Sequence, residues 1–447
     1  MLYLINPPTP MSSRKYRDIL RQVLAGLMAF TLLSGFCTVA VAFAELSKFL
    51  NSDRILILAP HPDDETIAAA GVIQGAVKAG AQVKVVLLTS GENNLMSFMA
   101  YDKRFFFGPK RIIRMGTMRK QETVNAMKKL GLAGKDVISL GYPDGGTLTI
   151  LTRRWGEAKS FRGRFSRAKR VPYSDAMTPG APYFGESILK DLEQIFLEYK
   201  PTKIFVSHPA DGNPDHQALY LFMQVTLWGL EGKMNSPEIY PYLVHADKWP
   251  LPKGYRPELK LTAPSELADG PLTWHQLDLS LAEVSNKYGA LQEYPSQSQY
   301  APNRLVSFVR QNELFSDYSV IRIGQAADSS ALTYTKQRDR LVVHLKLKRG
   351  LNKWLGASMF LLGYKKGISF SAMPKIEIVL RMNSFHIKDK GERLSKKEVR
   401  LIAHGKEWVL SIPLLLLGNP DCILSSAGTK LKDLSSAERA WRILALD

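Results

Sequence analysis

The stretch "RILILAPHPDDETIAAAG", Arg54–Gly71, decides the fold of this chain. It opens with a short apolar run, Arg54–Pro60, of the kind found in strands that are covered on both faces. Pro62 suits a tight turn, and an Ala- and Gly-rich helical pattern follows over residues 65–80. The stretch therefore predicts a strand, a sharp turn and a helix, which is the opening of a βαβ unit.

Strand and helix patterns continue to alternate after this unit. Further strands are expected over Gln82–Glu92, Val137–Gly146 with its loop, Lys203–Pro209 and near Tyr240, and helices over Arg111–Leu130, Glu186–Tyr199 and Asp215–Leu230. Repeated βαβ units predict an α/β fold with a Rossmann-like, mostly parallel sheet and helices on both faces. The first strand lacks a following G-x-G-x-x-G motif, so no dinucleotide is expected, and Gly71 and Gly75 are predicted to allow close packing.

The predicted secondary structure changes at about Ser319. Segments such as "RLVVHLKLKRG" and "KIEIVLRM" are strand-like and are separated by Gly, Asn and Lys turns. We expect an α/β domain over 45–318 and a smaller all-β, sandwich-like accessory domain over 319–447. Such appended domains often bind carbohydrate, but a packing or dimerisation module fits the pattern equally well.

The N-terminus has the pattern of an export signal. Basic residues precede an apolar stretch over about 23–42, and small residues follow at Ala42 and Ala44. We interpret 1–44 as a secretory signal peptide cleaved after Ala44, with an uncleaved membrane anchor as the alternative. Cleavage would leave Cys422 as the one thiol, which suits a bacterial periplasm or cell surface better than a disulfide-stapled secreted domain. The protein is expected to be exported: periplasmic, at the cell surface or secreted.

The chain is strongly basic, with a formal net charge of +19. This charge favours an acidic partner, such as an anionic glycan or a membrane surface, and export argues against nucleic acid. Two basic stretches, over about 97–118 and 153–170, follow predicted strands and are expected to overhang the strand ends. They are either solvated loops or part of a surface for an anionic substrate or a membrane.

Acidic and imidazole side chains crowd the turn after the first predicted strand. One aspartate here could simply cap the following helix. A cap does not explain His61 together with Asp63 and Asp64, because adjacent acids repel unless a cation lies among them. An imidazole and a carboxylate three residues apart around a sharp turn can face one metal ion, and catalytic zinc sites use three protein ligands and leave room for water.

A second cluster supplies candidates for the third ligand. "SHPADGNPDHQAL" follows the strand Lys203–Pro209 and contains His208, Asp211, Asp215 and His216. Both clusters lie at the carboxyl ends of strands in one predicted sheet, where ligands of α/β proteins gather. We therefore expect the two loops to converge around one divalent cation.

The motifs together resemble the PIG-L/LmbE-type zinc-dependent N-deacetylases, which include N-acetylglucosaminyl-phosphatidylinositol de-N-acetylase. The resemblance covers about 50–300 and leaves out the all-β part. It is carried by "APHPDDE" and "NPDH", in order with "MRKQE" (Met118–Glu122), "GYPDGG" (Gly141–Gly146) and "NKYGALQEYPSQ" (Asn286–Gln297).

The resemblance implies a role for each matching residue. His61, Asp64 and His216 become the ligands of a zinc ion, and Asp63 becomes the general base. Arg119 and Asp144 match positions that contact the sugar in relatives. Iron or cobalt remains an alternative, since such ligand sets accept several metals.

One position departs from the family pattern. Many relatives carry a histidine, thought to steady the oxyanion or to protonate the leaving nitrogen, where this chain has Asn213. Asparagine can donate a hydrogen bond but cannot titrate. His208, oriented by Asp211, is then a candidate for the proton transfer, or it is a strand-end histidine satisfied by backbone. Asp215 is expected to orient His216 or to cap its helix.

The resemblance and the ligand pattern predict a metal-dependent hydrolase that removes the acetyl group from an N-acetylhexosamine of the GlcNAc type. Its substrate would be an exported glycan, glycolipid or glycoconjugate, attacked by activated water. Two alternatives stay open. One is a catalytically weak protein that binds glycans, and the other is a zinc amidase acting on a non-sugar amide.

Overall fold

In the computed structural model, the described residues are 43–446 except 104–107, 157–158, 269–271, 319, 324–331, 348–355, 382–383, 396–397 and 430–438. They belong to one unit, Phe43–Asp447. The centre of the first predicted basic stretch, 104–107, and nearly all of the predicted signal segment lie outside the described residues. Among the described helices, none has the length and apolarity needed to cross a membrane.

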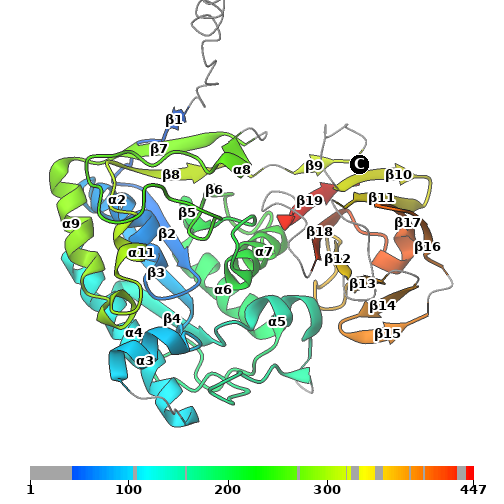
Figure 1. The fold of residues 1–447 in the computed structure, drawn as a ribbon, viewed down its shortest axis with the longest axis horizontal. Helices are drawn as coiled ribbons and strands as arrows, with labels where there is room; N and C mark the ends of the chain where they lie inside the picture. The colour runs from blue at the N-terminus through cyan, green and yellow to red at the C-terminus, as the bar shows by residue number, and fades with distance from the viewer. Residues whose placement is uncertain are drawn as a thin grey trace, which may run out of the picture. The chain divides into compact units, whose positions relative to one another are not determined.

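A mostly parallel sheet forms the first part of the fold (Figure 1). Its order is β1-β7-β8-β6-β5-β2-β3-β4, and among these strands only β8 runs against its neighbours. The strands are β1 (Phe43–Glu45), β2 (Arg54–Ala59), β3 (Gln82–Thr89), β4 (Val137–Tyr142), β5 (Lys203–Ser207), β6 (Glu238–Tyr242), β7 (Trp274–Asp278) and β8 (Asn312–Ser316). The predicted α/β class is confirmed.

Helices cover both faces of this sheet. They are α2 (Asp64–Lys78), α3 (Leu95–Asp102), α4 (Pro109–Lys129), α5 (Thr147–Arg153), α6 (Gly185–Tyr199), α7 (Pro214–Gly229), α8 (Ser265–Ala268), α9 (Leu281–Leu291), α10 (Pro295–Ser298) and α11 (Pro302–Val306). Helix α2 packs on one face with α9, and α7 packs on the other with α6. The alternating apolar runs of the sequence thus become a buried sheet between two helical layers.

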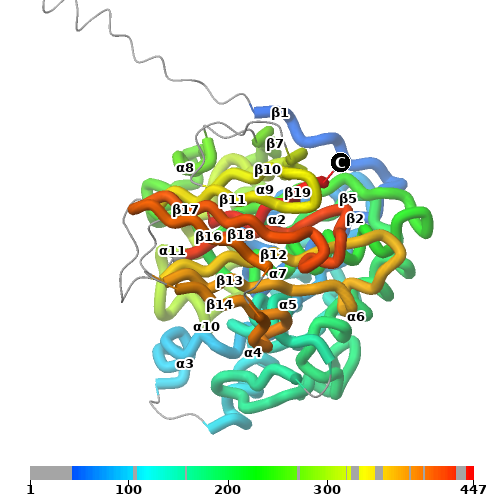
Figure 2. The backbone as a smooth tube through the Cα atoms, turned by 90° about the vertical axis from the view of Figure 1, so that its right-hand side faces the viewer, coloured from blue at the N-terminus to red at the C-terminus, as the bar shows by residue number. Residues whose placement is uncertain are grey.

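The C-terminal strands form two further sheets (Figure 2). One has the order β10-β11-β17-β16, and the other has the order β15-β14-β13-β12-β18-β19-β9. Their bounds are β9 (Ile321–Arg322), β10 (Leu332–Gln337), β11 (Arg340–Lys346), β12 (Ala357–Tyr364), β13 (Lys375–Arg381), β14 (Ser384–Asp389), β15 (Glu392–Leu394), β16 (Arg400–His404), β17 (Glu407–Pro413), β18 (Cys422–Thr429) and β19 (Arg442–Ala445). Side chains of both sheets share one hydrophobic core, so the C-terminal part is all-β as expected.

The C-terminal strands also share a core with the α/β part. Trp441 and Ile443 of the β19 region belong to the same buried cluster as Leu219 and Phe222 of α7. At the rim, Arg153 Nη2 lies 2.5 Å from Glu377 Oε1. The sheets change between Ser316 and Ile321, near the boundary expected at 318 and 319. That boundary stays a prediction, and the shared core shows that the two parts are packed together.

Strand β1 contains the predicted cleavage point. Phe43, Ala44 and Glu45 pair in parallel with Trp274–Gln276 of β7. Cleavage after Ala44 would cut within this strand. The signal peptide and the membrane anchor therefore both stay predictions.

Helix α2 bends at Ala69, whose φ of −136° and ψ of 21° are not helical. The Glu313 carboxylate accepts hydrogen bonds from the backbone N–H groups of Gly71 (2.9 Å) and Val72 (3.2 Å) beside the bend. A Cβ atom on Gly71 would lie 2.2 Å from Leu279 Cδ2. This confirms that Gly71 allows close packing.

Lys287 neutralises this buried carboxylate. Its Nζ lies 2.7 Å from Glu313 Oε1, and both side chains are almost fully buried. Lys287 belongs to the segment "NKYGALQEYPSQ", so part of that motif serves the packing of α2 rather than the chemistry of a site.

We expect Lys287→Met to lower the free energy of unfolding by about 3–5 kcal/mol, because it leaves the Glu313 carboxylate buried without its counter-charge. Urea unfolding of the full chain measures the change. Lys260→Met is the matched control, since Lys260 and Asp278 form an exposed pair at 2.7 Å, and its effect is expected to stay within about 1 kcal/mol. Equal effects of the two substitutions would contradict this account.

Candidate metal centre and active site

The candidate site lies where the order of the sheet reverses. The chain goes from β2 to β3 and β4 on one side and returns to β5 and β6 on the other, so β2 and β5 flank the switch point. Open α/β sheets bind ligands at the carboxyl ends of strands at this point. The turn after β2 carries His61–Asp64, and the loop after β5 leads to His216 in the first turn of α7.

The structure brings His61, Asp64 and His216 together. Asp64 Oδ2 lies 3.1 Å from His61 Nδ1 and 3.0 Å from His216 Nε2. The two imidazole rings are 5.3 Å apart between centroids. One ligand atom from each residue lies within 4.8 Å of the others, and all three residues are buried. This is the convergence that the sequence predicted.

These three residues fit a divalent cation. His216 Nε2 is buried and has no hydrogen-bond partner among the described residues, although Asp64 Oδ2 lies at ion-pair distance. The nitrogen therefore faces the carboxylate off the line of a hydrogen bond, as ligands around a common ion do. Two imidazoles and one carboxylate are a donor set that catalytic zinc sites use.

Two aspartates orient the imidazoles, each through the ring nitrogen that faces away from Asp64. His61 Nε2 lies 3.2 Å from Asp215 Oδ2, and His216 Nδ1 lies 3.2 Å from Asp211 Oδ2. The sequence predicted other partners for both aspartates. Asp215 was expected to orient His216 but contacts His61, and Asp211 was expected to orient His208 but contacts His216. Asp215 lies in the first turn of α7, where its side chain faces the loop after β4. Asp211 lies in the loop that precedes α7.

Asp215 is itself held firmly by the loop after β4. Its Oδ2 accepts a hydrogen bond from Gly145 N (2.6 Å), and its Oδ1 accepts from Thr147 N (3.0 Å) and Thr147 Oγ1 (2.6 Å). It does not cap α7, because the cap is Asn213, whose Oδ1 accepts from Asp215 N at 2.9 Å. Such outer contacts fix the orientation of a metal-ligating imidazole.

Asp63 adopts a strained backbone conformation at the start of α2, with φ 118° and ψ −30°. Non-glycine residues rarely take positive φ, and the cost is usually found at functional positions. Asp63 makes no side-chain cap of α2. Its carboxylate instead lines the pocket, with Oδ2 3.2 Å from Arg119 Nη2. The simple capping interpretation therefore does not account for this residue.

Arg119 is buried beneath the turn that carries Asp63. Its Nη1 donates to Gly91 O and its Nη2 donates to Pro62 O, both at 2.6 Å. Gly91 has φ 67°, and a Cβ atom there would lie 2.0 Å from Arg119 Nη1. Arg119 lines the pocket, as a sugar-contacting residue must, but most of its donors hold the backbone and Asp63.

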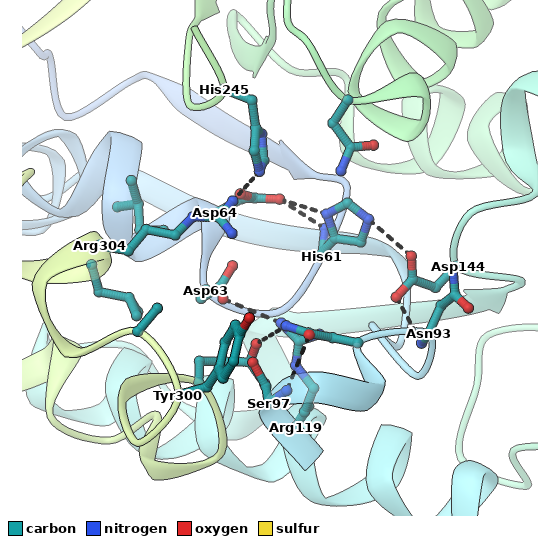
Figure 3. A pocket seen from close by; sticks show the side chains of 16 residues that line it. His61, Asp63, Asp64, Asn93, Ser97, Arg119, Asp144, His245, Tyr300 and Arg304 are labelled. Atoms are coloured by element: carbon teal, nitrogen blue, oxygen red, sulfur yellow. Dashed lines mark hydrogen bonds and ion pairs between the residues drawn. The ribbon is translucent and has the colours of Figure 1, made fainter. Parts of the chain in front are cut away.

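Asp144 and Asn93 lie across the pocket from Arg304 (Figure 3). Its Oδ2 accepts a hydrogen bond from Asn93 N at 2.9 Å, and its Oδ1 lies 3.4 Å from His61 Nε2. Asp144 therefore lines the pocket and also lies next to His61, a proposed metal ligand.

The two residues proposed to replace the family histidine have different positions. Asn213 lines the pocket, and since its Oδ1 caps α7, its Nδ2 is the atom that can donate to a substrate. His208 is fully buried and is not among the residues that line the pocket. Its Nδ1 accepts a hydrogen bond from Ala210 N, and its ring packs edge-on against Tyr318 at 5.2 Å. The backbone satisfies Nδ1, as the strand-end interpretation expects, but Nε2 is buried and has no hydrogen-bond partner among the described residues.

His245 is a pocket residue that the sequence reasoning missed. It follows β6, and its ring lies 4.6 Å from the His216 ring, at an interplanar angle of 89°. Its Nδ1 lies 3.1 Å from Asp211 Oδ1. The signal was present, because "YPYLVHA" ends a predicted strand with a histidine, as "ILAPH" and "VSH" do.

Burial and paired charges shift the pKa values at the site. Burial would raise the pKa of Asp64, but His216 and His61 outweigh it and hold that pKa well below its usual value. Burial would lower the pKa of His216, but Asp211 and Asp64 raise it to about 9. Burial raises the pKa of Asp63 to about 6, although the Arg119 charge opposes this, and that of Glu92 to about 8. A bound cation would compete with protons for the imidazoles.

Comparison with known proteins identifies the part of the chain that carries this site. Residues 56–226 match the family model described as PIG-L, GlcNAc-PI de-N-acetylase. These residues are called the PIG-L domain below, after the family model that they match. The resemblance predicted from the sequence is confirmed, while "NKYGALQEYPSQ" lies beyond the matched residues. All of the proposed ligands lie within the PIG-L domain.

A curated relative is 1D-myo-inositol 2-acetamido-2-deoxy-alpha-D-glucopyranoside deacetylase 1 of Saccharopolyspora erythraea. It is 28% identical over 172 residues, which cover 36% of this chain and 50% of that protein. The chain therefore matches only half the length of this relative.

Solved structures with a similar fold include N,N'-diacetylchitobiose deacetylase from Pyrococcus horikoshii, at 17% identity and a TM-score of 0.33, over 65% of this chain and 81% of that chain. They also include GalB, the 4-carboxy-2-hydroxymuconate hydratase of Pseudomonas putida, at 16% identity and a TM-score of 0.36, over 61% and 100%. At these values the likeness says nothing about the reaction.

Proposed function

We propose that this protein is a metal-dependent hydrolase that removes the acetyl group from an N-acetylhexosamine of the GlcNAc type. The observation that carries the proposal is the grouping of His61, Asp64 and His216 within 4.8 Å at the wall of a pocket that Asp63 also lines. The PIG-L match over 56–226 supports a de-N-acetylase, and the named relative acts on an acetamido sugar.

His61, Asp64 and His216 would hold one divalent ion, with zinc as the first candidate. When bound, such an ion lowers the pKa of water from 15.7 to about 7 and polarises a carbonyl group. Asp215 and Asp211 keep the two imidazoles in place: Asp215 is hydrogen-bonded to His61 Nε2, and Asp211 lies at ion-pair distance from His216 Nδ1.

Asp63 is the proposed general base. Its carboxylate takes a proton from the attacking water, and the water oxygen adds to the acetamide carbon. The same carboxyl then returns the proton to the nitrogen as the C–N bond breaks, which yields acetate and a free amine. The strained backbone and the Arg119 contact hold this carboxylate beside Asp64 without using it as a ligand.

Asn213 is proposed to stabilise the oxyanion through its Nδ2 group. Loss of one such donor typically lowers the rate on the order of a hundredfold or more. Asp144 and Arg119 are proposed to contact the sugar, because both line the pocket. His208 has no part in the proposed mechanism, because it does not line this pocket.

The proposed substrate is an exported glycan, glycolipid or glycoconjugate. The support comes from the signal-like N-terminal segment and from the net charge of +19, which favours an acidic or membrane-associated acceptor. The exported location and a possible N-terminal membrane anchor belong to this proposal.

Acetate release from a panel of N-acetylated sugars and non-sugar amides tests the proposal. We expect release from the sugars, a fall to background after dialysis against a chelator, and recovery when zinc is restored. Metal analysis of the purified protein, with iron and cobalt as alternative additions, identifies the ion. Metal-loaded protein that binds glycans without releasing acetate would be a binding protein, and release only from non-sugar amides would indicate another amidase.

A further inference from the structure

One wall of the pocket comes from residues that follow the PIG-L domain. Tyr300 and Arg304 lie on or beside α11, line the pocket, and face it from the side opposite Asp144 (Figure 3). Gln297 of α10 ties this wall to the other side, because its Oε1 accepts a hydrogen bond from Asn94 Nδ2 at 2.8 Å. This wall lies outside the family match, so it is where the specificity of this chain would be set.

Arg304 is held at the pocket by a neutral acceptor. Its Nη2 makes a close hydrogen bond to His245 Nε2. His245 Nδ1 lies 3.1 Å from Asp211 Oδ1. A carboxylate only accepts, so the ring proton is on Nδ1 and Nε2 is the acceptor that Arg304 needs. The contact positions the guanidinium group without cancelling its charge.

The charge of Arg304 is therefore open to a ligand. No Asp or Glu of the described chain forms an ion pair with it, whereas Arg119, the other pocket arginine, pairs with Asp63 and two backbone carbonyls. The Arg304 charge also opposes the rise that burial causes in the pKa of Asp63, but less than Arg119 does. Arg304 is also exposed, while Arg119 is buried. A guanidinium group with a fixed position and free donors suits the paired oxygens of a carboxylate or phosphate.

The position of Arg304 limits where that anion can lie on the substrate. A single imidazole, His245, separates Arg304 from His216, and the rings of His245 and His216 are 4.6 Å apart. An acetamide placed at the proposed ligands therefore has Arg304 close by. The anionic group must then be carried near the acetamido group, on a neighbouring carbon of the sugar ring.

Tyr300 provides a surface for the sugar itself. Its side chain is 50% exposed, although it lines the pocket. An exposed aromatic ring at a pocket mouth can cover the apolar face of a sugar while its hydroxyl group stays in water.

We propose that Arg304 and Tyr300 select an acidic substrate: an N-acetylhexosamine with a carboxylate or phosphate on the carbon next to the one that bears the acetamido group. The inference rests on the proposed deacetylase function and names the substrate class of the same site. Arg304 binds the oxyanion, and Tyr300 covers the ring.

Acetate release from four compounds tests the proposal: the methyl glycoside of N-acetylglucosamine, its 1-phosphate, its 6-phosphate and the 3-O-lactyl ether, N-acetylmuramic acid. We expect kcat/KM of wild-type protein to be about tenfold or more higher for the 1-phosphate, the lactyl ether or both than for the neutral glycoside. The 6-phosphate, whose charge is distant from the acetamido group, should gain less. Comparison of the 1-phosphate with the lactyl ether shows whether the site prefers a phosphate or a carboxylate.

Arg304→Ala should lower the ratio of acidic to neutral kcat/KM by about ten- to a hundredfold, and Arg304→Lys should restore part of it. Arg400→Ala, at an exposed position of β16, is the control and should leave the ratio unchanged. If wild-type protein hydrolyses the neutral glycoside and Arg304→Ala leaves the ratio unchanged, the anion site is wrong and the deacetylase stands. An equal advantage for the 6-phosphate also overturns it. Absence of acetate from every compound defeats the deacetylase proposal itself.

Discussion

Asp63→Asn is expected to lower kcat for acetate release by two to four orders of magnitude and to leave the metal content of the protein unchanged. General-base catalysis contributes about this much. Asparagine has the same shape and tolerates positive φ, so the φ of 118° at this position should persist. The substitution removes only the group that accepts the proton. Steady-state kinetics with metal analysis of the same sample measures both effects.

Asp64→Asn is the matched control, one residue away. Asp64 Oδ2 lies within 3.1 Å of both imidazoles, so its loss should lower both metal content and activity. The two variants together separate the proposed base from the proposed ligand. If Asp63→Asn retains more than about a tenth of wild-type kcat, another group must accept the proton.

Trp441→Ala is expected to lower the free energy of unfolding by about 3–5 kcal/mol, the usual cost of removing a buried tryptophan. Trp441 is 1% exposed and lies in the core that the C-terminal sheets share with α7. Its ring stacks on Phe360 with centroids 5.8 Å apart. Its backbone N donates to Pro209 O at 3.2 Å, in the loop that follows β5.

Urea unfolding of the full chain measures this loss, and Leu415→Ala is the control. Leu415 lies in the same C-terminal part but is 72% exposed, so its truncation should change stability by only about 0.5 kcal/mol. A small effect at Trp441 would mean that the two parts are held together weakly. The expected large effect also means that deletion of residues 320–447 would uncover the apolar side of α7.

The fold followed from the sequence because its elements have strong local signals. The apolar run Arg54–Ala59 and the helix after it reappear as β2 and α2, and the helix predicted at 111–130 is α4, Pro109–Lys129. The residues of the proposed metal site were found because two clusters follow strands of one parallel sheet. The switch point then brings the clusters together.

Long-range partners could not be predicted in the same way. Spacing in the sequence shows which residues share a loop, but not which side chain meets which across the sheet. The exchange of partners between Asp211 and Asp215 and the pairing of Lys287 with Glu313 depend on how the elements pack. The shared core of α7 and the C-terminal strands was missed because the change in predicted secondary structure near residue 319 suggested two independent domains.

The contact between β19 and the loop after β5 has a consequence for biosynthesis. Tyr318 packs against His208 and donates a hydrogen bond to Trp441 O. The segment that leads from β5 to His216 therefore packs against residues that are translated much later. A nascent polypeptide that ends before Trp441 already contains every proposed ligand but lacks this support. The activity proposed for this site is therefore expected to arise only after the final strands have been synthesised.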